Sequence, residues 1–242
     1  MIKQRTYILS LDGPCNQKCL FCMKTEDIER KPKKSYASVI KEIKNASVLG
    51  YKCIDFYRGE PTTYSFLKEA VSFANLLGLE VTLATNGVMF ASLDFTTRFF
   101  KETDIYGVRV SLHSDIPTVH DKITQVRGSW KSTISGIKNI LRFNDRLSVN
   151  VVITALNYKQ PLRIAHFIYS LGVKGIKYSG ICLAGRILEH KDIYVSYESF
   201  RAYLIDALKV CKKLNFKLIE IEKMPSRVLE EVNLKETAQF RE

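Results

Sequence analysis

Short apolar runs alternate with stretches of helical spacing along this chain. Six runs are rich in β-branched and aromatic residues, as buried strands are: Thr6–Leu11, Lys52–Tyr57, Leu79–Ala84, Gly107–Leu112, Leu147–Ile153 and Lys174–Tyr178. The helical spacing covers Tyr36–Leu49, Ser65–Leu77, Phe95–Lys101, Ser129–Phe143, Pro161–Leu171 and Ser196–Leu214. Strands alternating with helices in this way predict parallel pairing through right-handed crossovers.

This alternation fits either a doubly wound sheet or a barrel. Polar or reactive residues follow each predicted strand, and in a barrel all such loops face one mouth. We therefore predict an α/β fold with a partial, TIM-like (β/α)6 barrel as one domain over residues 1–222. The tail, 223–242, has Val228, Leu229 and Val232 at helical spacing, which predicts a helix that covers an open side of the barrel or frays.

The composition indicates a globular chain that folds without disulfide bonds. With 242 residues and 46% hydrophobic residues, the chain is able to bury a sizeable core. No window approaches the roughly 18 uninterrupted apolar residues of a membrane span, and Met1–Gly13 alternates like a strand, so we expect a cytoplasmic protein without a membrane partner. In that compartment the six cysteines are expected to be reduced, which favours a metal site or a catalytic device over a disulfide framework.

The net charge of +12 is compatible with a nucleic-acid partner or an acidic protein partner. The one local basic run, Arg30 to Lys34 around Pro32, is typical of a solvated loop. Known nucleic-acid signatures are missing from the sequence. A non-catalytic, metal-bearing module that binds nucleic acid nevertheless remains the alternative to an enzyme.

Three cysteines lie close together after the first predicted strand. Cys15, Cys19 and Cys22 have the spacing Cys-x3-Cys-x2-Cys in a loop that Gly13 and Pro14 open. Three thiolates can hold an iron–sulfur cluster and leave one iron free for chemistry. The spacing alone also allows a structural zinc with a fourth ligand such as His113, or three unrelated thiols.

Four sequence motifs, one of which contains these cysteines, resemble those of a known family. The stretch CNQKCLFC resembles the signature of the radical S-adenosylmethionine superfamily, and RGEPTTY is similar to the family's Gly-Glu-Pro motif. TNG and VSLHS lie where members carry comparable residues, and VHDKITQVRGSWKSTISGIKNI, VNVVITALNY and GIKYSGICLAGR resemble the molybdenum-cofactor cyclase and peptide-maturase branches. The likeness runs from about Thr6 to Leu214. Since no cysteine follows Cys211, we expect no C-terminal auxiliary-cluster domain of the SPASM type.

The resemblance implies a mechanism and its partners. Cys15, Cys19 and Cys22 would hold a [4Fe–4S] cluster whose open iron binds S-adenosylmethionine. Reductive cleavage would give a 5′-deoxyadenosyl radical that takes hydrogen from an organic substrate: a peptide or protein side chain, a small cofactor precursor, or RNA. A flavodoxin or ferredoxin would supply the electron.

The resemblance also implies cofactor-binding residues. Phe21 would pack by the adenine, Gly59 would let the backbone approach the methionine, and Glu60 would shape that turn. Ser111 and Asn86 would hydrogen-bond polar groups of the cofactor. Considered locally, Gly59 and Glu60 also suit a tight turn, Asn86 suits a turn, and Ser111 suits a cap.

Three further residues are candidates for catalysis. Arg58 stands where many relatives have glycine and is able to clamp a carboxylate or phosphate, or to point outward. His113 stands where an acidic residue is common and either faces the substrate or serves as a structural histidine. Cys182 follows the sixth predicted strand. Its candidate roles are a hydrogen-atom donor, a residue that binds substrate, the acceptor thiol of a radical-type methyltransferase, or a small apolar residue of the cavity wall. Cys53 and Cys211 are expected in the core.

Overall fold

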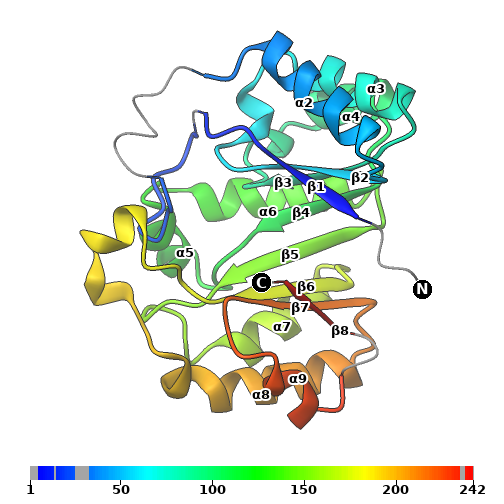
Figure 1. Cartoon of the computed structure of the whole chain (residues 1–242). Coiled ribbons are helices and arrows are strands. Elements are labelled where there is room, and N and C mark those ends of the chain that lie inside the picture. The colour runs from blue at the N-terminus through cyan, green and yellow to red at the C-terminus, as the bar shows by residue number, and fades with distance from the viewer. Residues whose placement is uncertain (1–4, 14, 25–32, 235–237, 242) are drawn as a thin grey trace.

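Figure 1 shows a sheet curled into an open barrel with helices on its outside. The structure is a computed structural model that describes residues 5–13, 15–24, 33–234 and 238–241. Pro14 and the first part of the basic run, Arg30 to Pro32, lie outside the described residues.

Among the described residues, the sheet has eight strands in sequence order, and every neighbouring pair is parallel. They are β1 (Thr6–Ser10), β2 (Cys53–Tyr57), β3 (Glu80–Thr85), β4 (Gly107–Ser111), β5 (Leu147–Val152), β6 (Gly175–Ser179), β7 (Leu218–Glu222) and β8 (Ala238–Arg241). The helices are α2 (Tyr36–Val48), α3 (Leu67–Leu76), α4 (Leu93–Glu102), α5 (Pro117–Thr124), α6 (Ser129–Ile140), α7 (Pro161–Ser170), α8 (Tyr197–Lys213) and α9 (Arg227–Glu231). The predicted parallel α/β half-barrel is confirmed.

The predicted number of strands was wrong. The sixth strand is followed by β7 and β8, and the helical pattern of the tail yields only the five-residue α9 before β8 pairs with β7. The prediction missed β7 because two of its five residues, Glu220 and Glu222, are acidic, and apolar runs were the signal used. The short helix α5 was missed as well.

Serines fix the start of several helices and so the position of the loops. Ser35, Ser92 and Ser196 each accept a hydrogen bond from a backbone N–H of the first turn of α2, α4 and α8. Pro161 occupies the first turn of α7, where its missing N–H costs nothing. The helices pack apolar side chains on the outer face of the sheet, and Cys53 and Cys211 are buried as expected.

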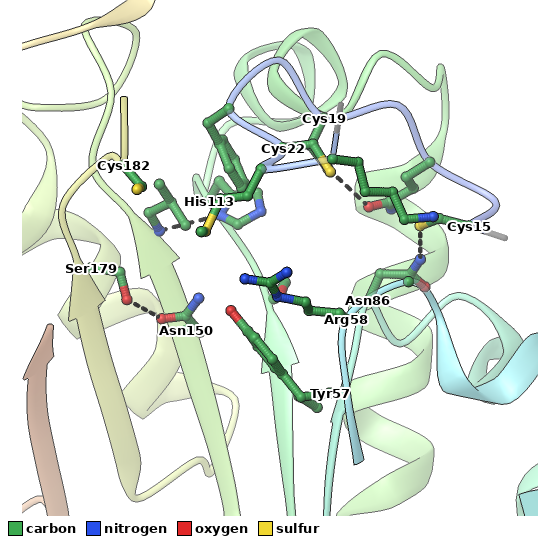
Figure 2. Close-up of a pocket in the computed structure, with 18 of the residues that line it drawn as sticks. Cys15, Cys19, Cys22, Tyr57, Arg58, Asn86, His113, Asn150, Ser179 and Cys182 are labelled. Carbon is green, nitrogen blue, oxygen red and sulfur yellow. Dashed lines mark hydrogen bonds between the residues drawn. The ribbon is translucent and has the colours of Figure 1, made fainter. Parts of the chain in front are cut away.

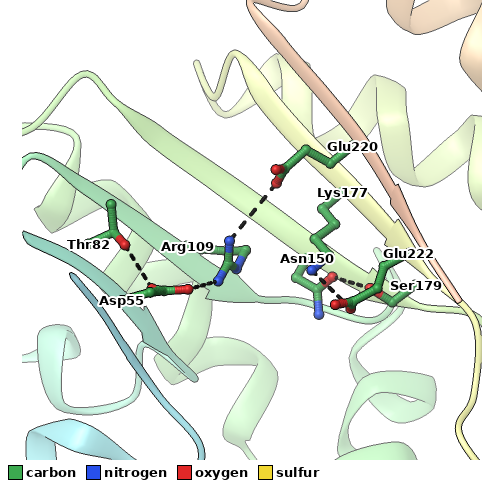
Figure 3. A network of polar contacts seen from close by, with 8 residues as sticks. All are labelled: Asp55, Thr82, Arg109, Asn150, Lys177, Ser179, Glu220 and Glu222. Atoms are coloured by element: carbon green, nitrogen blue, oxygen red, sulfur yellow. Dashed lines mark hydrogen bonds and ion pairs between the residues drawn. The ribbon is translucent and has the colours of Figure 1, made fainter. Parts of the chain in front are cut away.

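The inner face of the barrel is charged instead of apolar (Figure 3). Arg109 of β4 pairs with Asp55 of β2 at 2.6 Å and approaches Glu220 of β7 at 3.9 Å. Lys177 of β6 pairs with Glu222 of β7 at 2.9 Å. Arg109 thus links β2 and β4 in the first half of the barrel to β7 in the second half.

Candidate functional site

The loops at the carboxyl ends of the strands border one open cavity. Its lining comes from the loop after β1 and from the ends of the strands through β7. All eleven residues that the sequence singled out line it: Cys15, Cys19, Phe21, Cys22, Arg58, Gly59, Glu60, Asn86, Ser111, His113 and Cys182. The convergence predicted for a barrel mouth is therefore observed.

The cysteine loop forms one wall of this cavity, opposite Tyr57 and Arg58 (Figure 2). The Cys19 thiol donates to Oε1 of Gln17 at 3.7 Å, and burial raises the pKa of the Cys15 and Cys19 thiols. Backbone bonds fasten the loop to the end of α5: the N–H groups of Lys18 and Leu20 donate to the carbonyls of Thr124 and Ile123.

The three thiols of the loop border one cavity, and cysteine thiolates are the usual ligands of iron–sulfur clusters. Within the described part of the chain, no three Cys, His, Asp or Glu side chains converge as the ligands of one ion do. Three thiols spread along one cavity wall fit a group with several metal atoms, in which each thiolate binds its own iron. His113 does not complete a zinc site, because its Nδ1 accepts the backbone N–H of Val152 at 3.3 Å.

Arg58 and Gly59 make the turn that leaves β2. Both have positive φ, 63° and 62°, and for an arginine that backbone conformation is uncommon. A Cβ on Gly59 would lie 2.9 Å from the carbonyl oxygen of Gly13, so the close approach that requires glycine is to the start of the cysteine loop. The Arg58 guanidinium lies 3.4 Å from Asp12 and borders the cavity.

Glu60 is buried, and four donors surround its carboxylate. The N–H and hydroxyl of Thr62 and the hydroxyl of Thr85 donate to Oε1, at 3.2, 2.6 and 2.7 Å. The N–H of Asn86 donates to Oε2 at 2.7 Å. Burial raises the pKa of Glu60, and these hydrogen bonds oppose the rise. The carboxylate thus joins the turn after β2 to the turn after β3.

Asn86 and Ser111 lie on neighbouring strand ends. The Asn86 amide donates to Oδ1 of Asn16 at 2.5 Å and lies 3.9 Å from the sulfur of Cys15, so the loop after β3 contacts the cysteine loop directly. Ser111 ends β4, is partly exposed and faces the cavity.

His113 is buried and has a fixed tautomer. Because a backbone N–H only donates, the bond from Val152 to Nδ1 requires an unprotonated Nδ1 and leaves the proton on Nε2. Nδ1 of His120 likewise accepts a hydrogen bond, from the backbone N–H of His113 at 3.2 Å, and the two rings stack with centroids 5.5 Å apart. Burial lowers the pKa of His113 well below its usual value and that of His120 to about 4.

Phe21 and Cys182 complete the walls. The Phe21 ring meets the His113 ring edge to face, with centroids 4.9 Å apart. Cys182 lies across the cavity from Cys15 and is partly exposed. Asn157 does not line the cavity: its amide donates to the carbonyl of His113 at 2.7 Å and its Oδ1 accepts the N–H of Thr154, which supports the loop after β5.

Sequence reasoning missed several lining residues on the far side of the cavity: Tyr57, Asn150, Ser179, Glu222 and Lys223. The hydroxyl of Ser179 lies 2.8 Å from Oδ1 of Asn150, to which it donates, and 3.2 Å from Oε2 of Glu222. A polar residue inside an otherwise apolar strand run was the available signal. Burial raises the pKa of Tyr57.

Comparison with known proteins points to one family. Residues 13–168 match the model of the radical SAM superfamily. The GTP 3′,8-cyclase of Petrotoga mobilis is 26% identical over 211 residues, which cover 83% of this chain and 63% of that protein. An S-adenosylmethionine-dependent nucleotide dehydratase of Flammeovirga pacifica is 25% identical over 162 residues, 62% of this chain and 53% of that protein. The chain thus spans just over half to just under two thirds of these relatives.

Solved structures share the fold. Streptococcus suis SuiB superposes with a TM-score of 0.71 at 15% identity, covering 92% of this chain and 50% of SuiB. SuiB bound to its precursor peptide SuiA gives 0.66 at 16% identity, covering 97% and 48%. At this identity the likeness establishes the fold alone. No described helix has the length and apolar character that a membrane crossing needs.

Proposed function

Since this chain belongs to the radical SAM superfamily, we propose that it cleaves S-adenosylmethionine reductively and uses the resulting radical to take hydrogen from an organic substrate. When bound, a [4Fe–4S] cluster supplies the electron for this cleavage, and Cys15, Cys19 and Cys22 are its ligands. The observation that carries the proposal is the convergence of these cysteines with the Gly59–Glu60 turn on one cavity.

The chain's own residues divide into two groups around the cavity. The side of the cavity next to the cysteine loop binds S-adenosylmethionine and is shaped by Gly59, Glu60, Asn86 and Ser111. Phe21 packs against the adenine of S-adenosylmethionine. The side formed by β5 to β7 is left for the substrate, where Cys182 is a candidate hydrogen-atom donor. The cavity walls exclude water and so protect a reactive intermediate.

Arg58 and His113 face the cavity as hydrogen-bond donors. The guanidinium has no acceptor function, and the tautomer of His113 presents Nε2–H. Two donors favour a substrate with acceptor oxygens, such as a carboxylate, a phosphate or a peptide carbonyl. The proposed substrates are accordingly a peptide or protein side chain or a small cofactor precursor. The names of the relatives, GTP cyclases and a nucleotide dehydratase, support testing nucleotides first.

Anaerobic reconstitution with iron and sulfide, followed by an assay for 5′-deoxyadenosine with dithionite, tests this function. The intact chain is expected to bind about four irons, the content of a [4Fe–4S] cluster, and to form 5′-deoxyadenosine. The Cys19→Ala variant is expected to lose both, whereas Cys211→Ala, at a buried cysteine of α8, keeps them. Iron and cleavage retained in Cys19→Ala would overturn the ligand assignment, and a colourless zinc protein would favour the nucleic-acid-binding alternative.

A further inference from the structure

The segment between β6 and α8 contacts the cysteine loop, as α5 does. Figure 1 shows this segment, in yellow, beside the dark blue loop that follows β1. The N–H of Arg186 donates to the carbonyl of Cys22 at 2.9 Å. The last of the three cysteines is thus tied to a turn more than 160 residues further along the chain.

Gly185 makes this contact possible. A Cβ built on Gly185 would lie 2.4 Å from the carbonyl oxygen of Cys22 and 2.5 Å from the carbonyl carbon of Met23. These are backbone atoms, so they are unable to swing aside as the end of a side chain would. Gly185 also has a φ of 72°, which side chains other than glycine seldom adopt. The contact therefore excludes every other residue at this position on two separate grounds.

A small apolar cluster, separate from the main core, fastens the same two segments. Leu20 of the cysteine loop packs with Ile187 and Ile193 of the 3-10 turns Gly185–Leu188 and Lys191–Ile193. Phe21 and Ile181 pack at its edge. Hydrogen bond, close backbone approach and apolar contact together hold the loop in one position before any ligand is bound.

We infer that the turn at Gly185 and Arg186 is a clasp that positions Cys22 for cluster binding. Gly185 and the backbone N–H of Arg186 act through Cys22, so both residues are positioning residues. The link to cluster binding rests on the proposed function, whereas the contact itself concerns the chain alone.

The clasp is tested with two glycine variants. Gly185→Ala introduces both backbone strain and overlap with Cys22, whereas Gly50→Ala, at a φ of 77° with nothing within 4 Å of its Cβ, introduces the strain alone. Before iron is added, the rate at which iodoacetamide alkylates Cys22 in the full chain is measured by peptide mass spectrometry. We expect a several-fold faster reaction in Gly185→Ala and the wild-type rate in Gly50→Ala. Equal rates in both variants, with thermal melting showing both folded, would overturn the clasp.

Wild-type chain that assembles no cluster would refute the proposed function, and the alkylation result would stand independently of it.

Discussion

The carboxylate of Glu60 accepts the backbone N–H of Asn86 at 2.7 Å, and this bond joins two strand-end turns that are adjacent only in the folded barrel. Thr62 and Thr85 supply the remaining donors from the same two turns. A glutamine in place of Glu60 keeps one acceptor oxygen but points N–H groups at donors, which leaves buried groups unsatisfied.

We therefore expect Glu60→Gln to destabilise the chain by about 2–3 kcal/mol, or roughly 4–12 °C in melting temperature. Both turns border the cavity, and a misplacement of about 1 Å costs on the order of 100-fold in rate, so 5′-deoxyadenosine formation is expected to fall by a similar factor. Thermal unfolding and the cleavage assay check this. Glu69→Gln, at an exposed carboxylate in α3, is the control, and equal effects of the two substitutions would contradict the assigned role.

The His113 and His120 rings are expected to stay neutral across the pH range in which most histidines titrate. Each Nδ1 accepts a backbone N–H, and burial lowers the pKa of both rings. In the unfolded chain both histidine rings bind protons more readily than in the folded chain. The free energy of unfolding is therefore expected to fall as the pH drops below about 6.5. Nitrogen-15 NMR of the histidine-labelled full chain, with His113→Asn for assignment, checks the tautomer. A His113 ring protonated at Nδ1 at pH 6 would refute it.

Asp121 links α5 to the start of α6, and its replacement by asparagine is expected to destabilise the chain. The N–H groups of Gly128 and Trp130 donate to its carboxylate at 2.5 and 2.8 Å. Burial alone raises its pKa, but the hydrogen bonds, led by that from Trp130, outweigh burial and lower the pKa. Asp121→Asn is expected to cost about 1–2 kcal/mol at pH 7, as a lost helix cap does.

The pH dependence of this cost provides a second check. The depressed pKa of Asp121 contributes stability above the unfolded value, near 3.9, that is lost as the pH falls through the folded value. The difference between Asp121→Asn and wild type is therefore expected to shrink below about pH 4 in urea unfolding. Asp206→Asn, at an exposed carboxylate of α8, serves as control. A difference that stays constant down to the lowest accessible pH would argue against the assignment.

Arg109 is expected to be one of the most sensitive positions in the barrel interior. It pairs with Asp55 and Glu220, whose side chains are only 3% and 2% exposed. Removal of a buried cation beside buried carboxylates costs about 3–5 kcal/mol, so Arg109→Met is expected to destabilise by that amount. Arg163, an exposed residue that pairs with the partly buried Asp115, is the matched control, and Arg163→Met is expected to cost about 1 kcal/mol or less. Similar urea midpoints for the two variants would contradict the proposed role of the network.

The net charge of +12 leads to a prediction about the electron donor. We expect an acidic flavodoxin or ferredoxin to dock by electrostatic steering, which salt screens. Raising the salt concentration is then expected to slow donor-coupled formation of 5′-deoxyadenosine more than the dithionite-driven reaction. Equal salt sensitivity of the two reactions would rule out this mode of docking.

The sequence by itself determined the parallel α/β fold and the candidate residues that line the cavity. Apolar runs mark β1 to β6 because these strands are buried on their outer face, and the spacing of Cys15, Cys19 and Cys22 is a property of one short loop. Such local signals need no knowledge of distant contacts.

Only the tertiary structure decided the rest. The sequence did not predict β7, because Glu220 and Glu222 interrupt its apolar pattern. Arg109 and Lys177, which compensate these charges, lie on other strands, so the local sequence does not show the compensation. The tautomer of His113 depends on a backbone N–H 39 residues away. The contact of Gly185 with Cys22 joins the loop after β1 to the segment after β6, which are far apart in the sequence. The strand β7, the tautomer of His113 and the contact of Gly185 all depend on partners that are distant in the sequence. Residues next to them in the chain therefore do not predict them.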